Sequence, residues 1–488
     1  MGRSNKNSGF FLVIFFSSAL CTIYSLFFHP ITYEAQGDFP AYLDLAKQIY
    51  DLPGASDTDL SHRSPLYSLI LGLFIIIFGE AHFLAPLVVF QYILIFLTSL
   101  LVYKVIFQLT DNKTAAFIAG IAGILNLTTV FYGYMILSET LALFLFTLTA
   151  WLLLKFFQEE RLIYSAAAGI FAGLLVLTRY NTLGLPLVVT VLFLLLPLLP
   201  GKKLRLPRVF SGAALFVTGV LLILNLWALR NYISSGKYEV LPKHHTGQRW
   251  AVPSTISPDD IVSSEYREVL DIFLKTRDDL VTGEVNRRNR KSSLLEYGLI
   301  EKVNNYFRPD ISGYLIYRDS EEELLNYFHL ESNPEGIRAL NEKLKPFYDE
   351  IAIQNKNEIR RLRVYSLLYS FKHISPTIPG ESKLNLNNLP SFLLQTYKVL
   401  FILIMVLTYA GSAVHVFYLL SRKERPAAGK MWFIIYGIIW YFPVVNTYAI
   451  VLGDANRFRF PADMLIIGIF VAFCFHLFRY RYKSGGIA

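Results

Sequence analysis

The chain is poor in cysteine and in the motifs of soluble catalytic folds. Its 488 residues include two cysteines, Cys21 and Cys474, and both lie inside apolar segments. A disulfide framework and a cysteine-based metal site are therefore unsupported. The sequence also contains no glycine-rich phosphate-binding loop, no Ser/His/Asp arrangement and no zincin pattern. A nucleotide-sugar enzyme is disfavoured as well, because no loop predicted to be cytoplasmic is long enough to fold into a nucleotide-binding domain.

Charged residues are also scarce, and apolar residues take their place. Hydrophobic side chains make up 54% of the chain and aromatic ones 15%, whereas charged residues make up only 17% and the mean hydropathy is +0.42. A soluble fold of this length needs far less apolar surface, so the sequence predicts an all-α polytopic membrane protein. The formal charge of +9 does not indicate nucleic acid as a partner, because the basic residues lie mostly between hydrophobic segments.

Eleven stretches have roughly the length of membrane helices. The first, residues 10–28, follows a short basic head, and we interpret it as a retained signal anchor. The other apolar stretches are residues 64–79, 82–107, 114–131, 136–157, 163–178, 182–199, 209–229, 396–420, 431–452 and 461–480. We therefore expect a bundle of about 11 membrane helices.

Basic residues between these stretches predict the orientation, because cytoplasmic loops carry an excess of Lys and Arg. The segments expected on the outer face of the cell inner or plasma membrane are residues 29–63, 132–137, 178–182, 230–395 and 452–460. This alternation needs an odd number of crossings over residues 64–107, although Gly79-Glu80 splits that stretch in two. We expect residues 64–79 to be a partial or strongly tilted insertion; the alternative is a misleading charge signal.

The long polar stretch 230–395 predicts a small extracytoplasmic domain that is mainly helical. Helix starts are predicted at Ser257-Pro258-Asp259-Asp260, at the capping-box pattern Ser320 to Glu323, and at Asn333-Pro334. This domain separates a transmembrane module, residues 1–229, from C-terminal helices and a basic cytoplasmic tail, residues 396–488.

Polar residues gather on the predicted outer face, at the ends of apolar segments where a charge reaches water at lower cost than at mid-bilayer. They are Asp38, His62, Arg63, Glu139, Arg179, Arg230, His244, His245, Arg457 and Arg459. A single arginine at a helix end is usually an anchor, but so much positive charge on the outer face opposes the orientation bias. A lipid phosphate would explain it, because a guanidinium donates two hydrogen bonds to such a group and stays protonated. The strongest candidates are Arg63, Arg230 and the strip Arg457 to Pro461.

Asp38 has two interpretations. As a carboxylate at the membrane surface it is suited to act as a general base toward an acceptor hydroxyl. With Pro40 close behind it, Asp38 is equally suited to be a helix N-cap. Asp44 competes for the role of base.

Glu139 begins an otherwise apolar helix, where an acid is favourable near the positive end of the helix dipole. Its functional interpretation is a second acid that orients the acceptor or a neighbouring arginine. His62, His244 and His245 could hold a divalent metal, since imidazole is a common ligand. We predict no required cofactor, with this metal as the alternative.

Several short motifs occur in an order that resembles the GT-C superfamily of polytopic glycosyltransferases. They are Asp38, the helix start Arg63-Ser64-Pro65-Leu66-Tyr67, Tyr134 to Leu141, Gly173-Leu174 with Leu177-Thr178-Arg179, Trp227 to Asn231 with Gly236, and Arg457 to Pro461. The chain is most similar to the protein O-mannosyltransferase and lipid A aminoarabinose transferase group. The resemblance covers residues 10–235 well and 396–480 more loosely.

The resemblance implies a GT-C-type bundle and an inverting transfer of sugar from a polyprenyl-phosphate donor to a glycan, lipid or protein acceptor. It implies that Asp38 is the catalytic acid of the first loop and that Glu139 is a second catalytic acid. Donor contacts are expected from the arginines and an adjacent tyrosine: Arg63, Tyr67, Arg179, Arg230, Arg457 and Arg459. The alternatives are a transporter or flippase, and a polymerase or ligase, of lipid-linked glycans.

Overall fold

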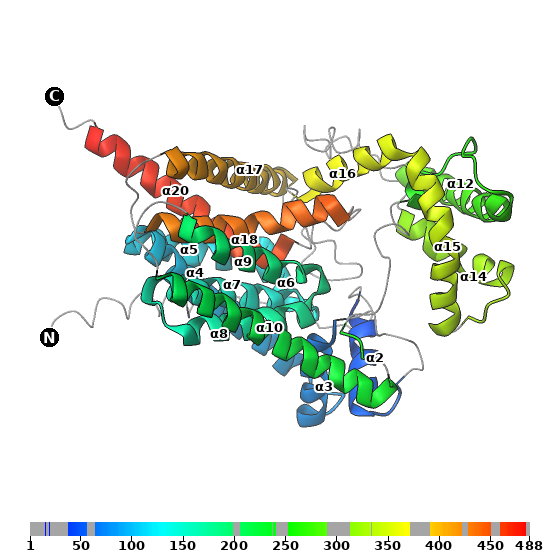
Figure 1. Cartoon of the computed structure of the whole chain (residues 1–488), viewed down its shortest axis with the longest axis horizontal. Helices are drawn as coiled ribbons and strands as arrows, with labels where there is room; N and C mark the ends of the chain where they lie inside the picture. The colour runs from blue at the N-terminus through cyan, green and yellow to red at the C-terminus, as the bar shows by residue number, and fades with distance from the viewer. Residues whose placement is uncertain are drawn as a thin grey trace.

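The structure is a computed structural model that describes residues 15, 19, 38–55, 64–198, 205–236, 238–240, 252–289, 313–332, 334–370, 391–421, 428–449 and 459–484. All regular secondary structure among these residues is helical, which confirms the predicted all-α class. Figure 1 shows a long helical bundle and a smaller helical body, joined by α16 (Lys356–Ser370). α16 packs against one helix of the bundle, α18 (Ala428–Ala449).

Apolar helices of two lengths form the bundle. Four of the described helices are long and apolar enough to cross a membrane: α4 (Leu84–Thr110), α7 (Glu139–Glu159), α10 (Leu206–Ser235) and α17 (Ser391–Ser421). A fifth candidate is the pair α5 (Lys113–Leu125) and α6 (Leu127–Tyr134), bent by 53°. The shorter apolar segments are α3 (Pro65–Phe78), α8 (Leu162–Thr178), Tyr180–Leu195 with α9 (Leu185–Leu195), Gly429–Val445 of α18, and Phe460–Phe475 with the first part of α20 (Asp463–Ser484).

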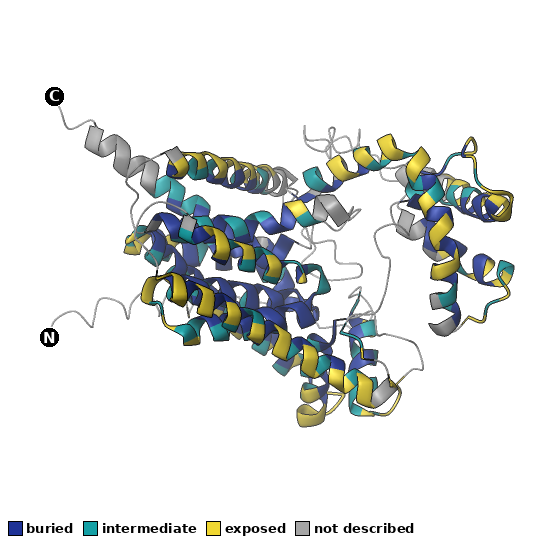
Figure 2. Cartoon of the chain, viewed as in Figure 1, coloured by how far each residue is buried: buried dark blue, intermediate teal, exposed yellow. Residues whose placement is uncertain are grey.

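Burial separates the inner helices of the bundle from the outer ones. Figure 2 shows α7 largely buried, whereas α10 and α17 have exposed outer faces. Those faces carry large apolar side chains such as Leu222, Leu226, Leu403 and Phe417, as expected for helices that contact lipid. The count of about 11 membrane helices remains a prediction, because most of residues 10–28 lie outside the described part of the chain.

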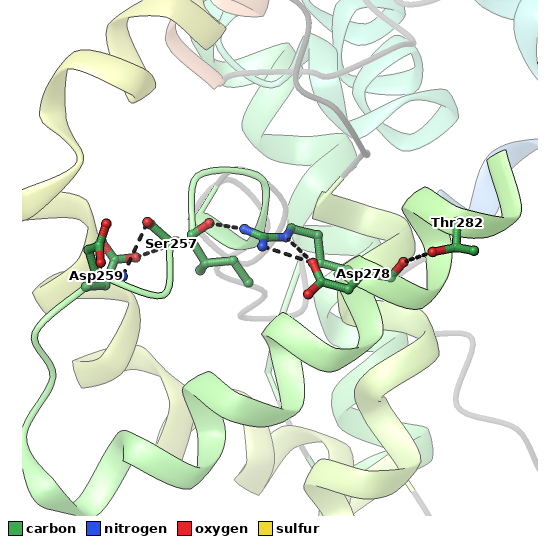
Figure 3. Close-up of polar contacts among 7 residues, drawn as sticks. Ser257, Asp259, Asp278 and Thr282 are labelled. Carbon is green, nitrogen blue, oxygen red and sulfur yellow. Dashed lines mark hydrogen bonds and ion pairs between the residues drawn. The ribbon is translucent and has the colours of Figure 1, made fainter. Parts of the chain in front are cut away.

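The smaller body has an apolar core of its own. It consists of α12 (Arg267–Asn289), α14 (Gly313–Tyr327) and α15 (Pro334–Gln354), with the short helices η4 (Val252–Ser254) and η5 (Ser264–Tyr266). The rings of Phe273 and Phe347 stack in this core with their centroids 5.6 Å apart. Arg277 of α12 donates to the Ile256 carbonyl and pairs with Asp278, so it fastens the loop to the helix (Figure 3).

The helix start predicted at Ser257 is wrong. Residues 257–260 form a turn in which the Asp260 carboxylate accepts a hydrogen bond from the Ser257 N–H at 2.7 Å. Two residues at the C-terminal end of α15 compete with helix formation here. Asn355, which follows α15, donates to the same carboxylate at 3.1 Å, and the Gln354 amide bonds the backbone of Ile261 as both donor and acceptor.

The capping box predicted at Ser320 is also wrong, whereas the third helix start is confirmed. Ser320 lies inside α14, and its hydroxyl donates back to the Ile316 carbonyl at 2.6 Å. Within a helix, a serine or threonine hydroxyl often donates in this way to the carbonyl one turn earlier. The prediction at Asn333-Pro334 is confirmed, because α15 begins at Pro334.

α3 is too short to cross a bilayer upright. Its 14 residues span about 21 Å, against a hydrocarbon core of about 30 Å. The helix ends at Gly79, whose φ of +78° is a left-handed conformation that favours glycine. The Gly72 Cα lies so close to α2 (Phe39–Tyr50) that an added Cβ would be 2.2 Å from the Tyr50 ring. Residues 64–79 thus form a short helix held against α2, and their partial or strongly tilted insertion stays a prediction.

α8 and α10 approach each other through glycine. A Cβ added at Gly169 of α8 would lie 2.1 Å from the backbone oxygen of Phe216, and one added at Gly219 of α10 would lie 2.8 Å from the Ala166 oxygen. Small residues commonly allow membrane helices to approach this closely. This close packing places the C-terminal end of α8, which Arg179 follows, beside the C-terminal half of α10.

We expect Gly169→Ala to lower the thermal unfolding midpoint of the detergent-purified protein. Alanine ordinarily favours a helix by about 1 kcal/mol, but overpacking against immobile backbone costs about 1–3 kcal/mol. Gly411→Ala in α17 is the matched control, because its Cβ would meet the movable ring of Phe473 at 3.0 Å. Equal midpoints for the two variants would contradict the backbone contact.

Candidate functional site

Loops predicted to share one face of the membrane meet at one end of the bundle. Figure 1 places α2, the outer end of α10 and the smaller helical body toward this end, away from the C-terminal end of α20. Near this end the ring of Phe460 packs against that of Tyr132, with centroids 4.5 Å apart. Polar residues that are distant in sequence are therefore near neighbours here.

Glu139 and Arg179 form a buried ion pair. Glu139 is the first residue of α7, and Arg179 follows the last residue of α8. The Arg179 Nη1 lies 2.8 Å from the Glu139 Oε1, while the two residues are only 7% and 0% exposed. Either charge buried alone would cost several kcal/mol, so each one stabilises the placement of the other. Two site residues predicted separately are thus one electrostatic unit.

Helix α2 is fastened directly to this unit. Tyr42 is buried, and its hydroxyl lies 3.1 Å from the Ser138 Oγ, next in the chain to Glu139. Burial raises the pKa of the Tyr42 hydroxyl above its ordinary value, and the Glu139 carboxylate raises it further. Tyr42 therefore stays neutral at physiological pH, and either hydroxyl can donate in its hydrogen bond with Ser138.

Asp38 occupies the N-cap position of α2, as its structural interpretation predicted, but its side chain makes no capping hydrogen bond. The residue is half-buried, and the Tyr42 N–H donates to its backbone oxygen at 3.2 Å. Asp38 thus begins the helical turn that ends at Tyr42. The N-cap position and a chemical role for its carboxylate are compatible.

Arg230 lies close to the same region on α10. Its guanidinium carbon is 5.1 Å from the centre of the Trp227 ring, and the residue is exposed. The side chain of Tyr180, in the short helix η2 (Tyr180–Thr182) that follows Arg179, lies close to Trp227. This region of the bundle thus carries one guanidinium buried against an acid and one that is exposed.

Comparisons with known proteins indicate a family for part of the chain and a fold for the whole. Residues 62–227 match the model of the dolichyl-phosphate-mannose-protein mannosyltransferase family. The chain resembles the GT-C glycosyltransferases, as its sequence predicted. The matched segment contains the pair Glu139 and Arg179 as well as Trp227, whereas Asp38, Arg230 and Arg459 lie outside it. The chain matches no curated protein sequence.

Solved structures share the fold at low sequence identity. The apo oligosaccharyltransferase of Archaeoglobus fulgidus aligns with 100% of this chain at 14% identity and a TM-score of 0.51. The oligosaccharyltransferase AglB of the same organism, in complex with an inhibitory peptide and a dolichol-phosphate, aligns with 98% at 13% identity and a TM-score of 0.50. The chain spans only about half the length of these proteins, 53% and 52%. The likeness shows a common helical membrane fold.

Two other predicted donor contacts are deeply buried. Tyr67 packs the edge of its ring against Tyr42, with centroids 5.3 Å apart. Arg459 is 0% exposed and holds Asp463 with two hydrogen bonds, of 2.6 and 3.1 Å. Arg459 also donates to the carbonyl of Ser370, the last residue of α16. It therefore joins α16 to the start of α20, and its predicted contact with the donor stays a prediction.

The remaining site predictions lie outside the described residues. They are His62, Arg63, His244, His245 and Arg457. Among the residues that the structure does describe, no group of three or more potential metal ligands occurs. The metal site predicted for the histidines is thus left untested.

Sequence reasoning missed Tyr42, Ser138, Tyr180 and Asp463 as partners of the predicted residues. Asp463 could have been found, because it lies four residues after Arg459 and that spacing brings side chains together on a helix. The other contacts join separate helices, and no spacing in the chain indicates them.

We expect Arg459→Met to lower the unfolding midpoint strongly, because removing one partner of a buried pair costs about 3–5 kcal/mol. The double variant Arg459→Met with Asp463→Leu should recover much of that loss, since no charge is then left buried alone. Thermal unfolding in detergent measures both effects. A single variant as stable as the parent would show that the pair contributes little.

Proposed function

We propose that this chain is an integral-membrane glycosyltransferase that moves a sugar from a polyprenyl-phosphate donor to an acceptor outside the cytoplasm. The observation that carries the proposal is the buried pair of Glu139 and Arg179, to which α2 is joined through the contact of Tyr42 with Ser138. Asp38 lies one helical turn before Tyr42, and Arg230 is stacked on Trp227. The family match over residues 62–227 supports glycosyl transfer. The dolichol-phosphate in the AglB structure supports a lipid-phosphate donor.

Arg230 and Arg179 are the proposed contacts of the donor phosphate. Arg230 is exposed and stacked on Trp227, so it can meet a ligand that arrives from outside the bundle. Arg179 is oriented by Glu139, and a guanidinium carries five N–H donors in a rigid fork. Fixed cations in a site of low dielectric stabilise a leaving phosphate most as its negative charge grows.

Asp38 is the proposed base of an inverting displacement. The acceptor hydroxyl gives its proton to the carboxylate, its oxygen bonds to the anomeric carbon, and the bond from that carbon to the phosphate oxygen breaks with its electron pair. Glu139 does not compete for this proton, because its carboxylate is paired with Arg179. If the acceptor is itself a phosphate, Asp38 would mainly position it.

The decisive experiment incubates the purified protein with a panel of polyprenyl-phosphate monosaccharides. A transferase releases polyprenyl phosphate and yields either a glycosylated acceptor or free sugar. A flippase yields neither product, and a polymerase or ligase would require a glycan donor. No turnover of any donor in the panel would overturn the proposal.

We expect Asp38→Asn to lower kcat by about 10²–10⁴-fold, the usual contribution of a general base, with the protein still folded. Asp44→Asn, within α2 itself, is the matched control and should keep most of the activity. Transfer rates and thermal unfolding are measured on both variants. Near-parental turnover of Asp38→Asn would refute its assignment as base, and loss in the Asp44 variant alone would move the role there.

We expect Arg230→Ala to raise the donor KM about tenfold or more, because a charged hydrogen bond to phosphate is worth about 1.5–3 kcal/mol. Arg230→Lys should lie between this variant and the parent, since lysine keeps the charge but loses the planar fork. The donor dependence of the initial rate measures the effect. An unchanged donor curve would remove Arg230 from the site.

A further inference from the structure

Gln91 is a buried amide whose hydrogen bonds lead toward both sides of the site. It lies in the second turn of α4 and is 1% exposed. Its Oε1 accepts from the Tyr67 hydroxyl at 2.9 Å, and its Nε2 donates to the carbonyls of Gly133 at 3.1 Å and Met135 at 2.9 Å. One side chain thus makes three of the four hydrogen bonds that an amide group can make.

The two carbonyls belong to the segment that leads into Glu139. Gly133 is in the last turn of α6, and Met135 follows that helix in an extended conformation. Only three residues separate Met135 from Glu139 at the start of α7. The Gln91 amide therefore determines where α6 ends and how the chain enters α7.

The Tyr67 hydroxyl links Gln91 to α2. The Tyr67 ring packs edge-on against Tyr42, and the Tyr42 hydroxyl contacts Ser138. These contacts close a ring of interactions: Gln91 to Tyr67, Tyr67 to Tyr42, Tyr42 to Ser138, and back through the chain to Met135 and Gln91. Asp38 lies one helical turn before Tyr42, and Glu139 follows Ser138. This closed set of contacts thus includes Tyr42, one helical turn after Asp38, and Ser138, the residue before Glu139.

The close packing of α6 on α4 favours this arrangement of hydrogen bonds. A Cβ on Gly133 would lie 2.6 Å from Ile95 and 2.9 Å from Tyr92, so α6 packs tightly on α4. The Tyr92 hydroxyl donates to the Val130 carbonyl at 3.1 Å, one turn earlier on α6. In an apolar bundle, a carbonyl that loses its donor is left unsatisfied and destabilises that arrangement.

We propose that Gln91 is a positioning residue that sets the spacing between Asp38 and Glu139. It touches neither donor nor acceptor and acts through Tyr67, Met135 and the residues they hold. This inference rests on the proposed function only where it concerns catalysis. The three hydrogen bonds of Gln91, which we call the clamp, are a property of the fold and can be tested without measuring turnover.

The test compares three variants by kinetics. Gln91→Met fills nearly the same volume without polar atoms, and it should lower kcat by about ten- to a hundredfold, as expected for a small misplacement of catalytic groups. The donor KM should stay within about twofold, because the arginines are untouched. Tyr67→Phe removes one of the three hydrogen bonds but keeps the ring, so its kcat should lie between Gln91→Met and the parent.

Ser99→Ala is the matched control on the same helix. Ser99 is buried and donates to the Gly120 carbonyl at 2.8 Å, so this variant also loses a buried hydrogen bond of α4. It should lower the unfolding midpoint while leaving kcat per folded molecule unchanged. If Ser99→Ala lowers kcat as much as Gln91→Met does, Gln91 has a general stabilising role and the inference is overturned.

Hydrogen exchange followed by mass spectrometry tests the clamp independently of activity. Peptides over residues 133–142 should exchange faster in Gln91→Met than in the parent, whereas Ser99→Ala should leave them unchanged. Unchanged exchange in Gln91→Met overturns the inference whatever the enzyme does. If the parent turns over no polyprenyl-phosphate donor, the proposed function fails, and faster exchange would still establish the clamp.

Discussion

Opposite charges buried side by side hold the candidate site together. Glu139 and Arg179 lie at the start of one helix and just past the end of the next, and either charge would be costly to bury in the bundle without the other. The pair therefore limits how far α7 and α8 can separate. Helix α2 adds its own contact through Tyr42 and Ser138. Three parts of the chain that are distant in sequence depend on one electrostatic contact.

The rest of the bundle makes that contact possible. Glycines bring α8 and α10 close enough for Tyr180, the residue after Arg179, to lie near Trp227, on which Arg230 is stacked. A second buried pair, Arg459 and Asp463, joins the end of α16 to the start of α20. Such pairs add little net stability over apolar packing but penalise any arrangement that separates their members. They favour specificity of geometry, which a transfer reaction needs.

The family match divides the site into two groups of residues. Glu139, Arg179 and Trp227 lie within residues 62–227, which match the mannosyltransferase family model. Asp38 precedes that segment, and Arg230 follows it. The proposed base and the exposed cation therefore come from the parts of the chain that flank the matched segment.

Local sequence patterns predicted much of the fold and some of the site. Apolar runs predicted the helical bundle, and Asn333-Pro334 correctly marked the start of α15. The patterns failed at Ser257 and Ser320, where Asn355 and a neighbouring turn of helix supply competing hydrogen bonds. Asp38, Glu139, Arg179 and Arg230 were all singled out from their positions at the ends of apolar segments. Their mutual contacts were beyond the reach of any local pattern.

The difference between what the sequence predicted and what only the structure showed has a physical cause. Hydropathy and charge are properties of each segment, so the sequence by itself determined that this is a helical membrane protein with its polar residues toward one end. Which acid neutralises which arginine depends on how helices cross, and the crossing is set by close packing at positions such as Gly169 and Gly219. The tertiary structure alone decided that Arg179 and Arg459 are paired and buried while Arg230 is exposed.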